Sequence, residues 1–102
     1  MTEPQDCHSM KELRRQIDVL DRDLVALLSR RVAYIDRAAQ LKPAEGLPAR
    51  IAARVEEVAA NARRNAEAAG LDADFAEALW RSMIDWSIAR EERVLGPSPE
   101  PN

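Results

Sequence analysis

An apolar stripe runs through the first half of the chain and begins close to Met10. Its side chains recur at alternating spacings of three and four residues, which is the period of one helix face. Ser9 and Glu12 fit a capping box at the start of the stripe, and neither Gly nor Pro follows before Pro43. The pattern predicts a single helix from about Met10 to Lys42, and its apolar face comprises Leu13, Ile17, Leu20, Leu24, Leu27, Tyr34, Ala38 and Leu41.

Two shorter helices are predicted after this break. Pro48 suits the first turn of the second helix, and Gly70 is typical of the position just past a helix end. Asp72 is the expected N-cap of the third helix, which Gly96 would stop. The second helix has an apolar face of Ile51, Val55, Val58, Ala62 and Ala66, and the third carries Phe75, Ala76, Leu79, Trp80, Met83, Trp86 and Val94.

These patterns predict an all-α fold of three helices, with one very long N-terminal helix. We expect a helical domain at residues 9–95, a flexible arm at 1–8 and a disordered tail at 96–102. The first helix would be roughly 50 Å long, whereas a compact chain of this length is only about 35 Å across. The helix therefore overshoots its own domain, and we expect a second copy of the chain to cover its stripe in a dimer or larger assembly.

Composition narrows the classes of function. A net charge of −3 and only four aromatic residues argue against a nucleic-acid-binding protein. The single cysteine, Cys7, excludes an internal disulfide and a zinc cluster of paired cysteines. No signal peptide is recognisable, and no apolar run approaches the length of a membrane span. We therefore expect a cytoplasmic protein without nucleic-acid or membrane partners.

The informative positions are polar residues that fall on apolar helix faces. Arg31 occupies the position of the first stripe, between Leu27 and Tyr34, where the spacing calls for an apolar residue. Lys42 lies three turns further along the same side of the helix. Ser87 and Glu91 form an inward i, i+4 pair on the third helix, and Arg54 borders the apolar face of the second. Because burying a charge without a partner is costly, these residues need either protein partners or an anionic ligand.

Both interpretations stay open at this point. In the first, Arg31 pairs with Glu91 for structural reasons and Lys42 only snorkels at a helix end. In the second, the cations bind a small dicarboxylate, since arginine forks suit carboxylates and lysine acts as a point charge. Arg14 lies roughly 25 Å from Arg31 along the helix, so one small ligand cannot contact both from one chain. Antiparallel pairing of two long helices would bring Arg14 to the partner's pocket, although Arg14 and Asp18 also fit an ordinary exposed pair.

Several motifs follow one another in a fixed order over residues 10–95. They are Leu13-Arg14-x-x-Ile17-Asp18-x-x-Asp21, Leu27-Leu28-x-x-Arg31, Lys42, Arg54 and Ser87-x-x-x-Glu91. In this order they resemble the intertwined all-helical chorismate mutases. The resemblance implies an intertwined homodimer of three-helix chains, with two active sites that each borrow an arginine from the partner. It also implies a small dicarboxylate substrate and no cofactor or metal.

The resemblance further implies a role for each candidate residue. Arg14 matches the borrowed arginine, and Arg31 and Arg54 match the residues that bind substrate carboxylates. Lys42 matches the lysine that contacts the ether oxygen and a carboxylate. Glu91 sits where many bacterial members have Gln and some members have Glu, and Ser87 is expected at the substrate one turn before it.

The chain departs from the family pattern early in the second helix. The family usually has acidic groups there, one of which holds the ring hydroxyl of chorismate. The matching positions of this chain are Ile51 and Val55, so the hydroxyl contact would need Glu45 or Glu56.

Three functions are weighed. The first is a chorismate mutase of aromatic amino acid biosynthesis in the shikimate pathway, which converts chorismate to prephenate by a pericyclic rearrangement. Its arginines would hold the compact substrate conformer, while Lys42 and a protonated Glu91 stabilise the charge that develops on the ether oxygen. The second is an isochorismate pyruvate lyase, which forms salicylate and pyruvate, since Asp6-Cys7, Arg30-Arg31, Gly70-Leu71-Asp72-Ala73-x-Phe75 and Trp86-x-Ile88-Ala89 are similar to those lyases. The third is a non-catalytic helical dimerisation module with structural ion pairs.

Overall fold

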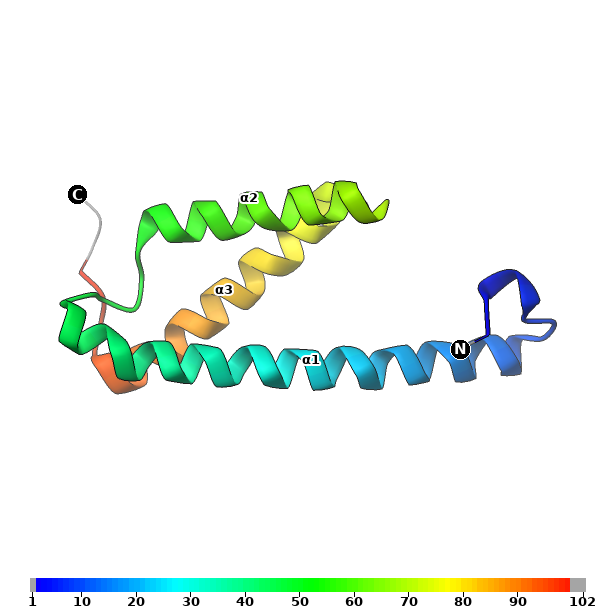
Figure 1. Ribbon diagram of the computed structural model, residues 1–102, viewed down its shortest axis with the longest axis horizontal. Helices are drawn as coiled ribbons and strands as arrows, with labels where there is room; N and C mark the ends of the chain where they lie inside the picture. The colour runs from blue at the N-terminus through cyan, green and yellow to red at the C-terminus, as the bar shows by residue number, and fades with distance from the viewer. Residues whose placement is uncertain (1, 100–102) are drawn as a thin grey trace. The chain divides into compact units, whose positions relative to one another are not determined.

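Three helices dominate the chain in the computed structural model, which describes residues 2–99. Helix α1 spans Met10–Glu45, α2 spans Ala52–Ala69 and α3 spans Ala73–Leu95, and a short 3-10 helix, η1, covers Pro4–Asp6 (Figure 1). No strand occurs in the described residues. The all-α prediction with one very long first helix is therefore confirmed.

The predicted helix-end signals act as expected at three positions. The Ser9 hydroxyl accepts a hydrogen bond from the Glu12 N–H at 3.1 Å, and the Asp72 carboxylate accepts one from the Phe75 N–H at 2.8 Å. Each side chain thereby satisfies a backbone donor that the first helical turn leaves unpaired. Gly70 ends α2 in the left-handed conformation, with φ at 76°.

Pro43 does not end α1, contrary to the sequence-based prediction. The helix continues through Pro43 to Glu45, because a proline in the last turn removes only one backbone hydrogen bond. Gly46 terminates the helix instead, with φ at 68°. The N–H groups of Gly46 and Leu47 donate to the carbonyls of Pro43 and Lys42, which is the hydrogen-bond pattern of a Schellman motif.

The start of α2 was also placed too early. Pro48 does not lie in the first turn of α2, because the backbone stays non-helical until Ala52. Ile51 is extended, with φ at −120° and ψ at 105°, and its carbonyl accepts the first hydrogen bonds of the helix. A loop at residues 46–51 therefore separates α1 from α2.

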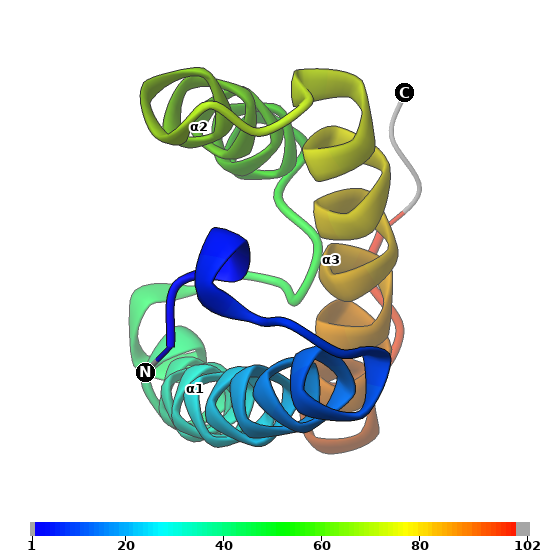
Figure 2. The same ribbon diagram turned by 90° about the vertical axis from the view of Figure 1, so that its right-hand side faces the viewer.

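Helices α2 and α3 pack against each other and meet at the turn around Gly70 (Figures 1 and 2). Their small buried side chains allow close approach of the two backbones: Ala59, Ala62 and Ala66 on α2 and Ala76 on α3. A second cluster lies nearer the other end of α3. It is formed by Ala49, Ile84 and Ile88, with Val55, Val58 and Leu95 packed against them.

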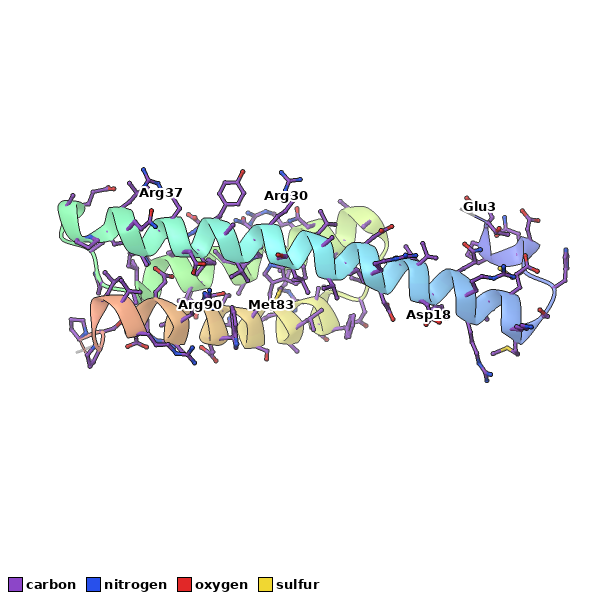
Figure 3. All side chains as sticks on the ribbon, turned by 90° about the horizontal axis from the view of Figure 1, so that it is seen from below. Glu3, Asp18, Arg30, Arg37, Met83 and Arg90 are labelled. Atoms are coloured by element: carbon purple, nitrogen blue, oxygen red, sulfur yellow. The ribbon has the colours of Figure 1, made fainter. Side chains whose placement is uncertain are left out.

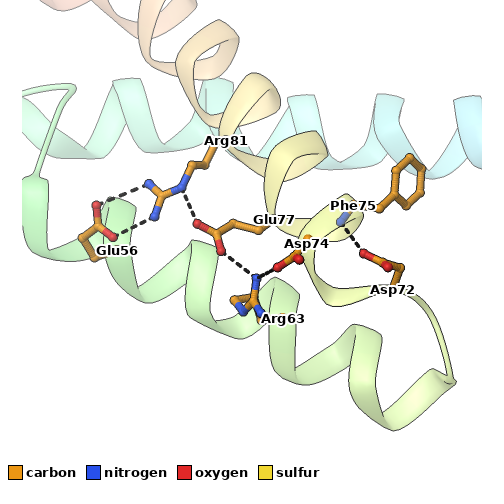
Figure 4. Close-up of polar contacts among 7 residues, drawn as sticks. All are labelled: Glu56, Arg63, Asp72, Asp74, Phe75, Glu77 and Arg81. Atoms are coloured by element: carbon orange, nitrogen blue, oxygen red, sulfur yellow. Dashed lines mark hydrogen bonds and ion pairs between the residues drawn. The ribbon is translucent and has the colours of Figure 1, made fainter.

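Ion pairs follow the outer side of the α2–α3 contact (Figure 4). Arg81 on α3 binds Glu56 on α2 at 2.9 Å and Glu77 one turn away at 2.7 Å. Arg63 on α2 binds Glu77 at 2.9 Å and Asp74 at 2.8 Å. These hydrogen bonds lower the pKa of Glu56 and Glu77 and raise that of Arg63. The network bridges α2 and α3, although each exposed ion pair contributes little to the stability of the fold.

Large apolar side chains remain exposed in the single chain. Leu24 and Leu27 of the α1 stripe are 56% and 59% exposed, and Trp86 on α3 is 52% exposed. The same holds for Ile17, Leu20, Leu28, Tyr34 and Leu41 on α1 and for Phe75, Leu79 and Val94 on α3. None of the described helices is long and apolar enough to cross a membrane.

Candidate active site

Lys42 and Glu91 form a buried ion pair between the last turns of α1 and those of α3. The ammonium Nζ of Lys42 lies 2.8 Å from Oε1 of Glu91. Only 5% of the Glu91 side chain and 17% of the Lys42 side chain is exposed. Charges so shielded from water attract each other more strongly than a surface pair does. The structure therefore brings together the two residues for which the sequence predicted a catalytic role.

One oxygen of this pair keeps an open hydrogen-bonding position. Oε1 of Glu91 has no hydrogen-bond donor among residues 2–99, because the nearby ammonium is close to it but not oriented for a hydrogen bond. The hydrogen bond of Lys42 goes instead to the backbone carbonyl of Ala49, at 2.9 Å. Buried polar atoms without a partner are uncommon in folded proteins. Oε1 is thus held by the charge of the Lys42 ammonium and by no hydrogen bond among the described residues.

Local structure explains why both side chains point inward. Lys42 lies just before Pro43 in the last turns of α1, and the loop that follows carries Ala49 back to its ammonium. Glu91 follows Ser87 by one turn of α3, so both share one helix face. Both are only 4% exposed, which confirms the inward i, i+4 pair that the sequence predicted.

The position of Lys42 differs from the one given by the structural alternative drawn from the sequence. That alternative made Lys42 a snorkelling residue at the helix end, but its ammonium lies on a buried carboxylate. Lys42 and Glu91 both lie in the C-terminal unit of the chain, which begins at Ile35. A helical pattern gives the face on which each residue lies but not which cation lies opposite a given carboxylate.

Arg54 is placed differently from the buried pair. Its side chain is 62% exposed, and it forms an ion pair with Glu57 on the same helix. The described contacts do not join Arg54 to Lys42 or Glu91. Because the Arg54–Glu57 pair is exposed and local, it is weak, and the guanidinium is free to turn toward an anion.

The structure also places the residues that were considered for a contact with the ring hydroxyl of a substrate. Val55 packs against the apolar cluster, as its place in the stripe predicted. The Glu56 carboxylate is bound by Arg81 at 2.9 and 3.3 Å, so it would have to leave that guanidinium to reach a substrate. Glu45 is exposed at the last residue of α1.

Arg14 and Arg31 lie in the N-terminal unit, residues 1–34. Arg14 is exposed and Arg31 is half-buried on α1. That these two arginines bind a substrate stays a prediction.

A second ion pair beside Lys42 and Glu91 was not found from the sequence. Arg90, the neighbour of Glu91, binds both oxygens of Asp36 at 2.6 and 3.1 Å. This bidentate contact lowers the pKa of Asp36 and raises that of Arg90. The Arg90 guanidinium also lies 5.6 Å from the centre of the Trp86 ring. Figure 3 shows Arg90 on α3 and Arg37 on the outer side of α1. The contact joins α3 to α1 one to two turns before Lys42.

The site therefore offers cations and one carboxyl group. Among residues 2–99, no group of three or more His, Cys, Asp or Glu side chains could hold a metal ion. The pattern of chorismate mutase type II matches residues 13–92, a range that contains all six predicted site residues. The chain belongs to this family.

The chain is similar to proteins of two different names. The chain is 39% identical over 94 residues to an isochorismate pyruvate lyase of Pseudomonas aeruginosa, and the match covers 89% of each chain. It is 38% identical over 87 residues to the T-protein of Haemophilus influenzae and 33% identical over 79 residues to that of Enterobacter agglomerans. Those matches cover 83% and 78% of this chain but only 22% and 21% of the T-proteins.

Proposed function

We propose that this chain is a chorismate mutase that converts chorismate to prephenate. The buried Lys42–Glu91 pair carries the proposal. An ammonium and a carboxyl group that meet at one buried point are suited to a single oxygen that gains negative charge. Membership of the chorismate mutase type II family supports this choice of reaction.

The proposed reaction is an internal rearrangement in which electrons move around a ring of atoms. One C–O bond breaks while one C–C bond forms, so no group leaves and no water enters. As the C–O bond breaks, negative charge grows on the ether oxygen. Lys42 would offer this oxygen a positive charge. Glu91 pairs with Lys42 as a carboxylate in the free protein and would have to take up a proton when substrate binds, so that its carboxyl group can donate a hydrogen bond. Both contacts strengthen toward the transition state, which is the condition for faster turnover.

The remaining candidates would bind the two carboxylates of the substrate. Arg31 and Arg54 from one chain and Arg14 from a partner would hold chorismate in its compact conformer, with Ser87 beside it. Fixing that conformer removes part of the entropic cost of reaching the transition state. Arg54 would exchange its exposed contact with Glu57 for a substrate carboxylate.

This arrangement requires a homodimer with shared active sites. The exposed stripe of α1, which includes Leu24 and Leu27, has the length and the apolar character to pair with a second copy. Antiparallel pairing would place Arg14 of one chain near Lys42 and Glu91 of the other. One surface of α1 would then both hold the dimer together and complete the site.

A second candidate is isochorismate pyruvate lyase. The relative of that name in Pseudomonas aeruginosa matches the chain over 89% of both lengths. Val55, moreover, lies in the apolar cluster at a position where chorismate mutases usually carry an acidic group. The ring hydroxyl occupies different positions in chorismate and isochorismate, so a missing acidic contact bears directly on this choice. The lyase would use the same pair to stabilise the breaking C–O bond.

Product identification separates the candidates. Purified protein is incubated with chorismate and, separately, with isochorismate, and the products are resolved by chromatography. Prephenate from chorismate supports the mutase, whereas salicylate and pyruvate from isochorismate alone would favour the lyase. If neither compound gives a product, the third interpretation, a non-catalytic helical dimerisation module, is favoured. A Lys42→Ala variant, which should be inactive, controls for contaminating enzyme.

A further inference from the structure

Ser98, just beyond α3, links two separate parts of the chain. Its hydroxyl accepts a hydrogen bond from the backbone N–H of Arg50 at 2.9 Å, and its own N–H donates to Oε2 of Glu92 at 2.8 Å. Arg50 lies in the loop between α1 and α2, which has no helical hydrogen bonds of its own at this point. Figure 1 shows the segment that follows α3, drawn in red, beside this loop. Ser98 therefore ties the loop to the end of α3.

The tied loop is the one that holds Lys42. Ala49, the neighbour of Arg50, accepts the hydrogen bond of the Lys42 ammonium at 2.9 Å. Lys42 then contacts Glu91, which is next to Glu92 on α3. Ser98 thus connects Glu92 on α3 to the loop. The loop in turn contacts Lys42, and Lys42 contacts α3 through Glu91.

Ala49 of the loop packs on Ile84 and Ile88 of α3, and the loop has one other polar side-chain contact with α3 among the described residues. Arg50 forms an ion pair with Asp85 at 3.2 Å, but the Asp85 side chain is 69% exposed. An exposed pair of this kind contributes little to holding a backbone in place. The packing of Ala49 holds its side chain, and the half-buried hydrogen bond to Ser98 is the stronger polar restraint on the adjoining backbone, whose peptide group includes the Ala49 carbonyl.

We propose that Ser98 is a positioning residue for Lys42, acting through the Ala49 carbonyl. The catalytic part of this inference rests on the proposed function, in which Lys42 contacts the ether oxygen. Without the Ser98 hydroxyl the loop moves, and the carbonyl no longer holds the ammonium at one point. The ammonium then spends less time where the transition-state charge develops.

The test uses the two lysines of the chain. Lys42 and the exposed Lys11 are the only ones in the sequence, so each reports on a different site within the same molecule. Acylation by acetic anhydride is followed by peptide mass spectrometry, and the rate at Lys42 is divided by the rate at Lys11. This ratio measures how firmly the Lys42 amine is held, whether or not the protein is active. The kcat/KM for the substrate is measured on the same samples.

Three variants complete the design. Ser98→Ala removes the hydroxyl, and Ser98→Thr keeps it. Ser82→Ala removes an exposed hydroxyl on α3 and serves as the matched control. Ser98→Ala should raise the acylation ratio about fivefold and lower kcat/KM about fivefold, the effect expected of one ordinary hydrogen bond. Ser98→Thr and Ser82→Ala should behave like the wild type.

Two results would overturn the inference. An unchanged acylation ratio in Ser98→Ala would show that Ser98 does not hold Lys42. An unchanged kcat/KM in that variant would show that holding Lys42 in this way does not matter for turnover. Failure of the proposed function is recognised separately, as a wild type that converts neither chorismate nor isochorismate, and the acylation ratio still decides the role of Ser98 in that case.

Discussion

Nζ of Lys42 on α1 lies 2.8 Å from Oε1 of Glu91 on α3. Each is costly to bury alone, and each makes the burial of the other tolerable. The pair therefore couples the stability of the fold to the chemistry of the site. Substrate binding would act on the same two groups that hold the end of α1 to α3.

Removal of Lys42 should destabilise the protein as well as inactivate it. Lys42→Met leaves the Glu91 carboxylate buried without its cation, and the free energy of unfolding should fall by about 3 kcal/mol. Urea unfolding measures this loss, with Lys11→Met as an exposed control. The double variant Lys42→Met, Glu91→Leu should recover most of the stability but no activity. Equal stability of Lys42→Met and wild type would contradict the buried pair.

Activity should depend on a hydrogen-bond donor at position 91. As a carboxylate Glu91 repels the charge that develops on the ether oxygen, whereas as a carboxylic acid it donates a hydrogen bond. Glu91→Gln keeps a donor and should retain kcat/KM, whereas Glu91→Leu has none and should lower it about a hundredfold. Glu67→Gln on the exposed face of α2 should behave like the wild type. Equal kcat/KM in Glu91→Gln and Glu91→Leu would place Glu91 away from the ether oxygen.

The Asp36–Arg90 contact should contribute to stability in a defined pH range. The hydrogen bond from Arg90 lowers the pKa of Asp36 in the folded state. The contribution is therefore fully present above the unfolded-state pKa of about 3.9 and is lost as pH falls through the lower folded-state value. Urea unfolding is measured at a series of pH values from about 6 downward, so that the series passes through that pKa. Asp36→Asn should be less stable than wild type at the upper end of the series. The two proteins should become equally stable at the lower end. Asp23→Asn, on the exposed part of α1, should follow wild type throughout.

Two chains should share each active site. Light scattering at micromolar concentration should show a dimer, since large apolar side chains of the α1 stripe such as Leu24 and Leu27 are exposed in one chain. Arg14→Ala and Arg31→Ala should each inactivate the enzyme without unfolding it. Mixed under subunit exchange, the two inactive variants should regain activity, because one site of the heterodimer then has both arginines. Proven exchange without recovery, or a stable folded monomer, would rule out the shared site.

Periodicity and capping predicted most of the fold. The stripe of α1, the Ser9 and Asp72 caps and the Gly70 end follow from local rules that need no tertiary information. The errors lay at Pro43 and Pro48, where proline was taken to mark a boundary. A proline late in a helix is tolerated, and a proline before one need not start it, so the true ends depended on Gly46 and Ile51.

In the candidate site, the sequence predicted the helix face of some residues but not their contacts. The inward positions of Ser87 and Glu91 follow from helical spacing. The contacts of Arg90 with Asp36, and of Ser98 with the loop, depend on how one helix is rotated against another and on where the chain turns after Gly96. No local pattern in the sequence carries that information.

The most direct test of the account is the ratio of kcat/KM for chorismate to kcat/KM for isochorismate, measured on one preparation of the wild-type protein. The proposed mutase predicts a ratio well above one, with prephenate as the product, and loss of that activity in Lys42→Ala. A ratio well below one, with salicylate and pyruvate formed, would contradict it and assign the Lys42–Glu91 pair to the lyase reaction.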